Sequence, residues 1–150
     1  MDNEMTLSFI AISENEGLAR MVMTSFIASL DPTIDELAEF KTIVSEAVTN
    51  AIIHGYEEDA QGIVTIRAKR DGRKITMTIS DEGRGISDLE QAMEPLFTTK
   101  PERERSGMGF TIMESFSDHL SVWSEPQKGT AITFSKDFSP IHSKITMGER

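Results

Sequence analysis

Two short segments in which apolar and polar residues alternate, 63–69 and 74–80, lie on either side of Asp71-Gly72. Alternation with a period of two is typical of a strand with one buried face. Both residues of an Asp-Gly pair tolerate positive φ, as a tight hairpin turn requires. The pattern therefore predicts an antiparallel β-hairpin, and any fold of this chain must place these two strands side by side.

Three further strands are predicted from shorter patterns. Residues 6–12 alternate between apolar and polar, and segments 120–124 and 131–135 are joined by a turn at 127–129. Short strands connected by tight turns favour an antiparallel sheet over a doubly wound one, in which helices separate the strands regularly.

Two long helices are predicted between the first strand and the hairpin. Ser13 with Glu16, and Thr33 with Glu36, have the spacing of capping boxes, which begin helices. Gly55 is a suitable end for the second helix. The expected apolar face of the first helix consists of Leu18, Met21, Val22, Phe26 and Leu30. Shorter helices are expected at 87–93 and 108–116.

These elements predict an α+β fold, a two-layer sandwich with helices on one face of a mixed, mostly antiparallel sheet. A chain of 150 residues is long enough for one domain with its own core. We expect this domain to span residues 1–136, followed by a polar tail at 137–150.

Composition narrows the classes of function. The net charge of −10 argues against nucleic acid as a partner, because phosphate neutralisation needs clustered Lys and Arg. An acidic surface suits a basic protein partner, although it also serves solubility alone. The chain has no cysteine and no apolar stretch of membrane-spanning length. We therefore expect a cytoplasmic protein without disulfides that does not enter the membrane.

The first candidate for chemistry is a polar stripe on the second helix. Glu46, Asn50 and His54 are spaced four apart, so they lie on one side of a helix. An amide oxygen can hold Mg²⁺, and a carboxylate can accept a proton from a hydroxyl group. Taken alone, the same stripe is also what an ordinary exposed helix face presents.

The second candidate is Asp81-Glu-Gly83-Arg-Gly85, directly after a predicted strand. The glycines allow the backbone to approach a flat ligand closely. A buried carboxylate can accept a hydrogen bond from an exocyclic amine such as that of adenine. The alternative is a plain turn at the end of a strand.

The third candidate is a glycine-rich helix start preceded by a basic loop. Free N–H groups and the positive end of the helix dipole suit a phosphate chain, and basic side chains can clamp its terminal phosphate. An ordinary helix start is the alternative. The candidate residues are Thr98, Thr99, Lys100, Arg105, Ser106, Gly107, Met108 and Gly109.

The order of these segments, with Gly129-Thr130 before the last strand, resembles the pattern of the GHKL ATPases over about residues 5–136. No Walker P-loop motif is present. Within that class the chain most resembles the small anti-sigma serine kinases, above all those of the sporulation anti-sigma F type. This likeness rests on the segments EAVTNAIIHGY (46–56), PLFTTKP (95–101) and ERSGMGFTIME (104–114).

The resemblance implies a Bergerat-type ATP-binding fold and an anti-sigma factor. Such a protein binds a sigma factor and uses Mg²⁺-ATP to phosphorylate a serine on an anti-anti-sigma antagonist. By resemblance, Glu46 is the general base, Asn50 the Mg²⁺ ligand and Asp81 the adenine acceptor. His54, Gly83, Gly85, Thr130 and the residues of the third candidate would contact the nucleotide.

Two alternatives remain open. One is a nucleotide-dependent module that binds a sigma factor without transferring phosphate, and the other is a histidine-kinase fragment, for which 150 residues show no phosphoacceptor hairpin. The resemblance also implies a homodimer. Its candidate surfaces are the first strand and the first helix, where Glu16 and Arg20 are expected to form an exposed ion pair and to contact a partner.

Overall fold

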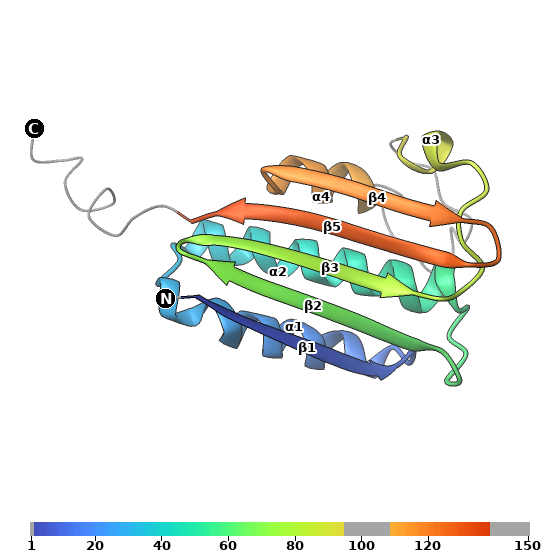
Figure 1. The fold of residues 1–150 in the computed structure, drawn as a ribbon, viewed down its shortest axis with the longest axis horizontal. Coiled ribbons are helices and arrows are strands. Elements are labelled where there is room, and N and C mark those ends of the chain that lie inside the picture. Colours follow the sequence, from blue (N-terminus) through green and yellow to red (C-terminus); the bar gives the residue numbers. More distant parts are fainter. Residues whose placement is uncertain (1, 95–108, 139–150) are drawn as a thin grey trace, which may run out of the picture.

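The computed structural model describes residues 2–94 and 109–138, which form a five-stranded sheet with helices on one side (Figure 1). The spatial order of the strands is β1-β2-β3-β5-β4. Their bounds are β1 Asn3–Ile10, β2 Ile63–Asp71, β3 Lys74–Asp81, β4 His119–Glu125 and β5 Gly129–Asp137. All four pairings among these strands are antiparallel, so the described sheet is not mixed.

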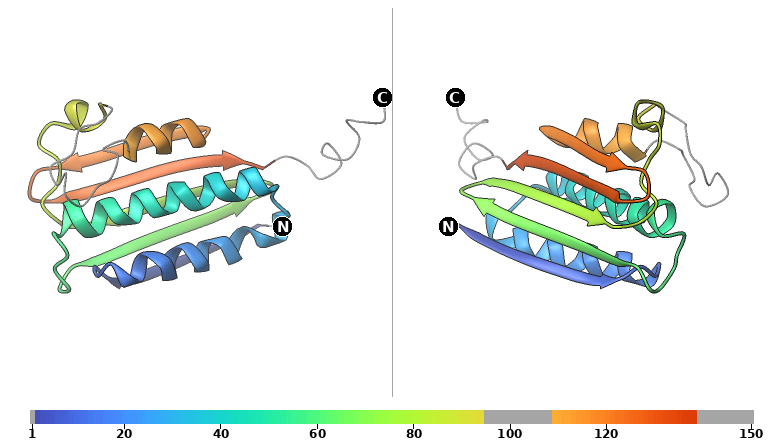
Figure 2. Two further views of the ribbon diagram at one scale, coloured as in Figure 1. Left: turned by 180° about the vertical axis from the view of Figure 1, so that it is seen from behind. Right: turned by 45° about the vertical axis from the view of Figure 1, so that its right-hand side comes forward.

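The helices lie side by side across one face of the sheet, and Figure 2 shows them from behind. The elements are α1 Glu14–Ile27, η1 Ala28–Leu30, α2 Ile34–Thr49, η2 Asn50–Gly55, α3 Leu89–Ala92 and α4 Gly109–Phe116. The central helix, α2, contacts both α1 and α4. The predicted α+β two-layer sandwich is confirmed.

The predicted hairpin is confirmed, with its turn displaced by one residue. Asp71 pairs with Lys74, so the two loop residues are Gly72 and Arg73. Gly72 has a φ of 63°, which glycine adopts without steric cost.

The core lies between the sheet and the helices. Phe40 of α2 is fully buried, with its ring 6.2 Å from that of Phe134 and 6.1 Å from that of Phe138. Aromatic pairs at such distances add to the stabilisation that their burial provides. Because Phe138 is buried, the packed part of the chain continues two residues beyond the boundary expected at residue 136.

The two expected capping boxes have different outcomes. Thr33 accepts a hydrogen bond from the Glu36 N–H, and the Glu36 carboxylate accepts one from the Thr33 N–H, so this box is confirmed. The box at Ser13 is wrong. Ser13 has helical dihedral angles (φ −57°, ψ −32°) and caps nothing, whereas a capping side chain needs an extended residue. Its hydroxyl donates instead to Glu58.

The predicted apolar face of the first helix is partly wrong. Leu18 is 49% exposed and Met21 is 71% exposed. The side of α1 that meets the core is rotated from the expected one, and its buried members are Ala19, Met23, Phe26 and Ile27. Periodicity alone did not distinguish these two overlapping sides.

Three basic side chains connect the sheet to carbonyl groups near helix ends. Arg70 donates to the Phe26 carbonyl, Arg73 to that of Leu30, and Lys136 to that of Phe116. Cations interact favourably with the partial negative charge at a helix C-terminus, and the carbonyls there lack partners within the helix. These contacts anchor the ends of α1, η1 and α4 to the sheet.

Within residues 2–94 and 109–138, none of the helices is both long enough and apolar enough to span a bilayer.

Candidate functional site

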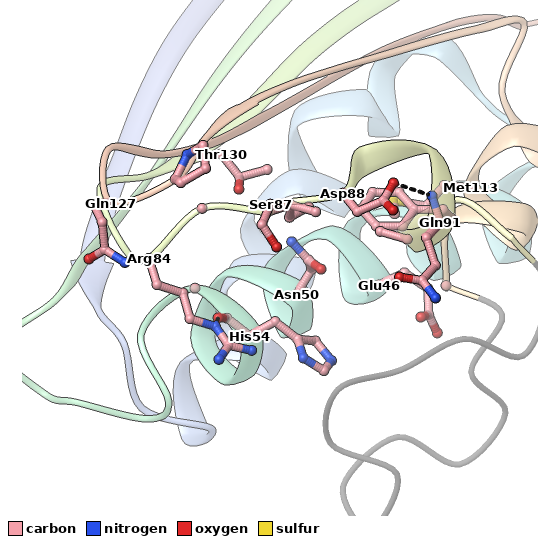
Figure 3. A pocket seen from close by; sticks show the side chains of 17 residues that line it. Glu46, Asn50, His54, Arg84, Ser87, Asp88, Gln91, Met113, Gln127 and Thr130 are labelled. Carbon is pink, nitrogen blue, oxygen red and sulfur yellow. Dashed lines mark hydrogen bonds between the residues drawn. The ribbon is translucent and has the colours of Figure 1, made fainter.

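A pocket opens between the end of α2, the loop after β3 and the start of α4 (Figure 3). Its walls come from segments that are far apart in the sequence. The described lining residues are Glu46, Asn50, His54, Gly55, Arg84, Gly85, Ile86, Ser87, Asp88, Gln91, Ala92, Gly109, Phe110, Met113, Pro126, Gln127 and Thr130.

The polar stripe on the second helix faces this pocket. Glu46, Asn50 and His54 all line it, as the four-residue spacing predicts. The winding changes at Asn50, where the α-helix gives way to a π-helical turn, and the Tyr56 N–H bonds to the Ala51 carbonyl five residues back. Such turns are rare and frequently occur at functional sites.

Asp81 lies behind the pocket wall and is only 6% exposed. Burial raises the pKa of its carboxyl group to about 6, although hydrogen bonds from the backbone of Gly83 and Thr130 act in the opposite direction. Desolvation disfavours the charged form, and the hydrogen bonds favour it. Near neutral pH the site therefore holds a buried carboxylate that is a strong hydrogen-bond acceptor.

Two glycines allow the helix end and the loop after β3 to approach each other closely. A Cβ at Gly55 would lie 2.8 Å from the Asp81 carboxyl carbon, and one at Gly83 would collide with the Gly55 carbonyl. Arg84 closes this contact, because its N–H bonds to the Gly55 carbonyl and its Nε to the His54 carbonyl. The loop that carries Asp81 is thus joined directly to the helix that carries Asn50.

The described residues bring together most of the expected site. Glu46, Asn50, His54, Gly85, Gly109 and Thr130 line the pocket, while Asp81 and Gly83 support its wall. The remaining expected residues, Thr98, Thr99, Lys100, Arg105, Ser106, Gly107 and Met108, lie outside the described residues.

Several lining residues were not predicted. Asp88 accepts a hydrogen bond from the Gln91 N–H at 3.0 Å and so begins α3. An Asp three residues before a Gln is a sequence signal for such a cap. Arg84 and Gln127 lie in turns, and Phe110 and Met113 belong to the apolar side of α4. Arg84, Phe110 and Met113 belong to segments that carry the predicted motifs, but no local pattern identifies these individual side chains, or Gln127, as lining residues.

A second depression lies on the other side of Glu46. It is lined by Arg20, Lys41, Thr42, Ser45 and Glu46, so Glu46 borders both hollows. Arg20 forms the expected ion pair with Glu16, at 3.5 Å. The pair is partly buried and not exposed as expected, because the Arg20 side chain is 43% exposed and that of Glu16 is 21% exposed.

Across residues 2–94 and 109–138, no three His, Asp or Glu side chains converge as a metal cluster. The amide oxygen of Asn50 is nevertheless a suitable single ligand. Magnesium is commonly bound by one or two protein oxygens together with phosphate oxygens and water.

Comparisons with known proteins agree with this geometry. The family model of the histidine kinase-like ATPase domain matches residues 11–136. An anti-sigma F factor of Lysinibacillus sphaericus is 63% identical over 145 residues, covering 97% of this chain and 99% of that protein. The anti-sigma F factor of Bacillus subtilis (strain 168) is 61% identical over 139 residues, covering 93% and 95%.

Solved structures share the fold at lower identity. The crystal structure of the RsbU and RsbW domains of a Mycobacterium tuberculosis protein matches with a TM-score of 0.65 and 17% identity, over 91% of this chain and 32% of that one. The catalytic domain of the histidine kinase ThkA matches with a TM-score of 0.57 and 17% identity, over 91% and 97%.

The fold and the pocket, with the family match, define the class: the chain belongs to the histidine kinase-like ATPases, the GHKL class to which its motifs pointed. Within that class, the near-full-length identity shows that it belongs to the family of anti-sigma F factors.

Proposed function

We propose that this protein is an ATP-dependent serine kinase that also binds a sigma factor and keeps it from RNA polymerase in the cytoplasm. Its phosphorylation substrate is a serine of an anti-anti-sigma antagonist. The observation that carries the proposal is the position of Glu46. This carboxylate borders both the nucleotide pocket and the depression that contains Arg20, so it lies between a nucleotide and a docked protein.

The nucleotide is proposed to be ATP. Asp81 accepts a hydrogen bond from the adenine amine, and Thr130, Gly83 and Gly85 shape the pocket around the base. Asn50 and His54 lie further along the same wall, toward Glu46 (Figure 3). Asn50 would hold Mg²⁺, which supplies charge neutralisation on the phosphates when it is bound. Gly109 and the basic residues before it are proposed to contact the phosphates of the nucleotide.

The proposed chemistry of this chain's own residues is limited to one proton. The Glu46 carboxylate takes the hydroxyl proton of the acceptor serine as that oxygen bonds to the γ-phosphorus and ADP departs. Most of the remaining catalysis in phosphoryl transfer comes from positioning and from charge stabilisation. A carboxylate placed for hydrogen-bond contact with the acceptor is the usual form of such a base.

The protein partners are proposed to dock over α1, where Arg20 and Glu16 lie beside the depression that Glu46 borders. The relatives are named as anti-sigma F factors, which supports a sigma factor as one partner. A homodimer is proposed as the working unit. Strand β1 is an edge of the sheet, and an unpaired edge is one surface on which a second copy can add.

The test is incubation with radiolabelled ATP, Mg²⁺ and a candidate antagonist, followed by phosphoserine analysis. We expect label on a serine of the antagonist. A protein that binds nucleotide and the sigma factor but labels no antagonist would instead be the binding module without kinase activity.

A further inference from the structure

Ser124, on β4, lies behind the pocket and makes three hydrogen bonds through one hydroxyl group. The Ile86 N–H donates to its oxygen at 2.7 Å. The hydroxyl lies 3.0 Å from the Gly129 carbonyl oxygen and 2.9 Å from the Thr130 hydroxyl oxygen. These three bonds use the hydroxyl group completely, so any effect that Ser124 has on a ligand must pass through these neighbours.

The direction of the bond between the two hydroxyl groups follows from counting protons. A serine hydroxyl has one proton and two acceptor positions. The Gly129 carbonyl can only accept, so the Ser124 proton is used there. The Thr130 hydroxyl must therefore donate its own proton to Ser124. With the Ile86 N–H as its second donor, the Ser124 oxygen is fully satisfied.

The consequence falls on Thr130, whose hydroxyl borders the pocket (Figure 3). With its proton directed at Ser124, this oxygen offers only lone pairs to a ligand. Asp81, its partner in the β3–β5 pairing, is also an acceptor near neutral pH. Two acceptors from neighbouring strands therefore lie at this end of the pocket, Thr130 in its lining and Asp81 directly behind Gly55 of the wall.

We propose that Ser124 is a specificity-determining positioning residue, which holds Thr130 as an acceptor so that the pocket selects a purine with an amino group at position 6. This inference rests on the proposed binding of ATP. A carbonyl oxygen at position 6, as in hypoxanthine or guanine, would face two acceptors and no donor. Sites built from buried polar groups discriminate strongly when a partner is missing.

The test compares the affinities of ADP and inosine diphosphate. ADP has an amino group at position 6, whereas inosine diphosphate has a carbonyl there and a proton on the adjacent N1. Both are measured by calorimetry with Mg²⁺ on the full chain. We expect the wild-type protein to prefer ADP. In Ser124→Ala the Thr130 proton becomes available to a carbonyl, so we expect the preference for ADP to fall about tenfold, the scale of one hydrogen bond.

Ser121→Ala is the matched control. It removes a serine hydroxyl from the same strand, at an exposed position on the opposite face of the sheet. We expect its preference for ADP to equal that of the wild type. Ser124→Thr, which keeps the hydroxyl, should restore the preference. In a Thr130→Val background, Ser124→Ala should change the preference no further, because Ser124 acts through Thr130.

Two outcomes would overturn the inference, and they can be distinguished. If Ser124→Ala weakens both nucleotides equally, Ser124 is only a structural support, and the proposed function stands. If the wild-type protein binds both nucleotides equally, adenine recognition itself is wrong. If Ser124→Ala does not fold, Thr130→Val alone tests the acceptor that Ser124 is proposed to hold, and an unchanged preference for ADP in that variant would overturn the inference.

Discussion

At the scale of single residues, burial of the Asp81 carboxylate lowers the stability of the fold near neutral pH but provides an acceptor for a ligand. Its carboxyl has a raised pKa because burial outweighs two backbone hydrogen bonds. Between about pH 4 and pH 6, the Asp81 carboxyl is therefore protonated to a greater extent in the native protein than in the unfolded chain. The stabilising contribution of protonated Asp81 is complete below that window and is lost as the pH rises through about 6.

Nucleotide binding should depend on pH in the opposite direction. The proposed adenine contact needs ionised Asp81, so we expect ADP affinity to be constant above about pH 6.5 and to fall below about pH 6, approaching tenfold per unit. Calorimetry at constant ionic strength measures this. Asp81→Asn serves as the control, because the phosphate groups of ADP titrate in the same way with either protein. It should bind ADP roughly 30-fold or more weakly, without the added pH dependence. Identical pH profiles for the two proteins would exclude Asp81 as the cause.

Glu46 is the residue whose removal should separate binding from chemistry. We expect Glu46→Gln to bind ADP with unchanged affinity and to phosphorylate the antagonist more slowly by a factor of about 10² or more, the usual effect of losing a general base. Asn50→Ala should instead weaken Mg²⁺-dependent nucleotide binding itself. Single-turnover phosphorylation with saturating ATP measures the first effect. A normal rate in Glu46→Gln would place the base elsewhere.

At the scale of elements, the helices are held by specific contacts at their ends. Thr33 begins α2 with a complete capping box, while Ser13 precedes α1 without capping it. Arg70 is buried, donates to Ser29 and to the Phe26 carbonyl, and lies 5.5 Å from the centre of the Phe26 ring. The start of one helix and the end of another are therefore joined to the rest of the fold by side chains that satisfy backbone groups.

The two capping positions make a matched pair of variants. We expect Thr33→Ala to lower the free energy of unfolding by about 1 kcal/mol, the usual effect of losing a cap. Ser13→Ala loses only an exposed hydrogen bond to Glu58 and should change stability by less than about 0.5 kcal/mol. Urea denaturation measures both. Equal losses would mean that the Ser13 hydroxyl contributes as much as a cap, contrary to its helical dihedral angles.

At the scale of the whole molecule, the arrangement of helices on one face brings α1 beside α2, the helix that carries Glu46. Arg20 and Glu46 come from different helices and border one depression. A partner that docks over α1 is thereby close to the nucleotide pocket. The charge of −10 would also speed encounter with a basic partner segment in a salt-dependent way.

Reversal of one charge tests this docking surface. We expect Arg20→Glu to weaken binding of the antagonist or the sigma factor at least tenfold, because a docked partner would lose a cation and meet a carboxylate. ADP affinity and thermal stability should be unchanged. Arg67→Glu is the control, since Arg67 is exposed on the face of the sheet that lacks helices. Surface plasmon resonance measures both variants. Normal partner binding by Arg20→Glu would move the docking surface elsewhere.

Local sequence patterns were sufficient to predict the features that depend on short stretches of chain. The hairpin around Gly72, the cap at Thr33 and the stripe of Glu46, Asn50 and His54 follow from turn chemistry, capping and helical period. These act over a few residues, so a local pattern contains the necessary information. The order of the motifs was also sufficient for the class of protein.

The contacts between atoms of distant segments became known only from the packed fold. It selected Ala19 and Met23 over Leu18 and Met21 as the buried side of α1. It placed Arg84 against the end of η2, and it raised the pKa of Asp81 by surrounding the carboxyl with protein. The three hydrogen bonds of Ser124 join three separate stretches of chain. Packing and desolvation depend on such long-range neighbours, which no local period or turn signal specifies.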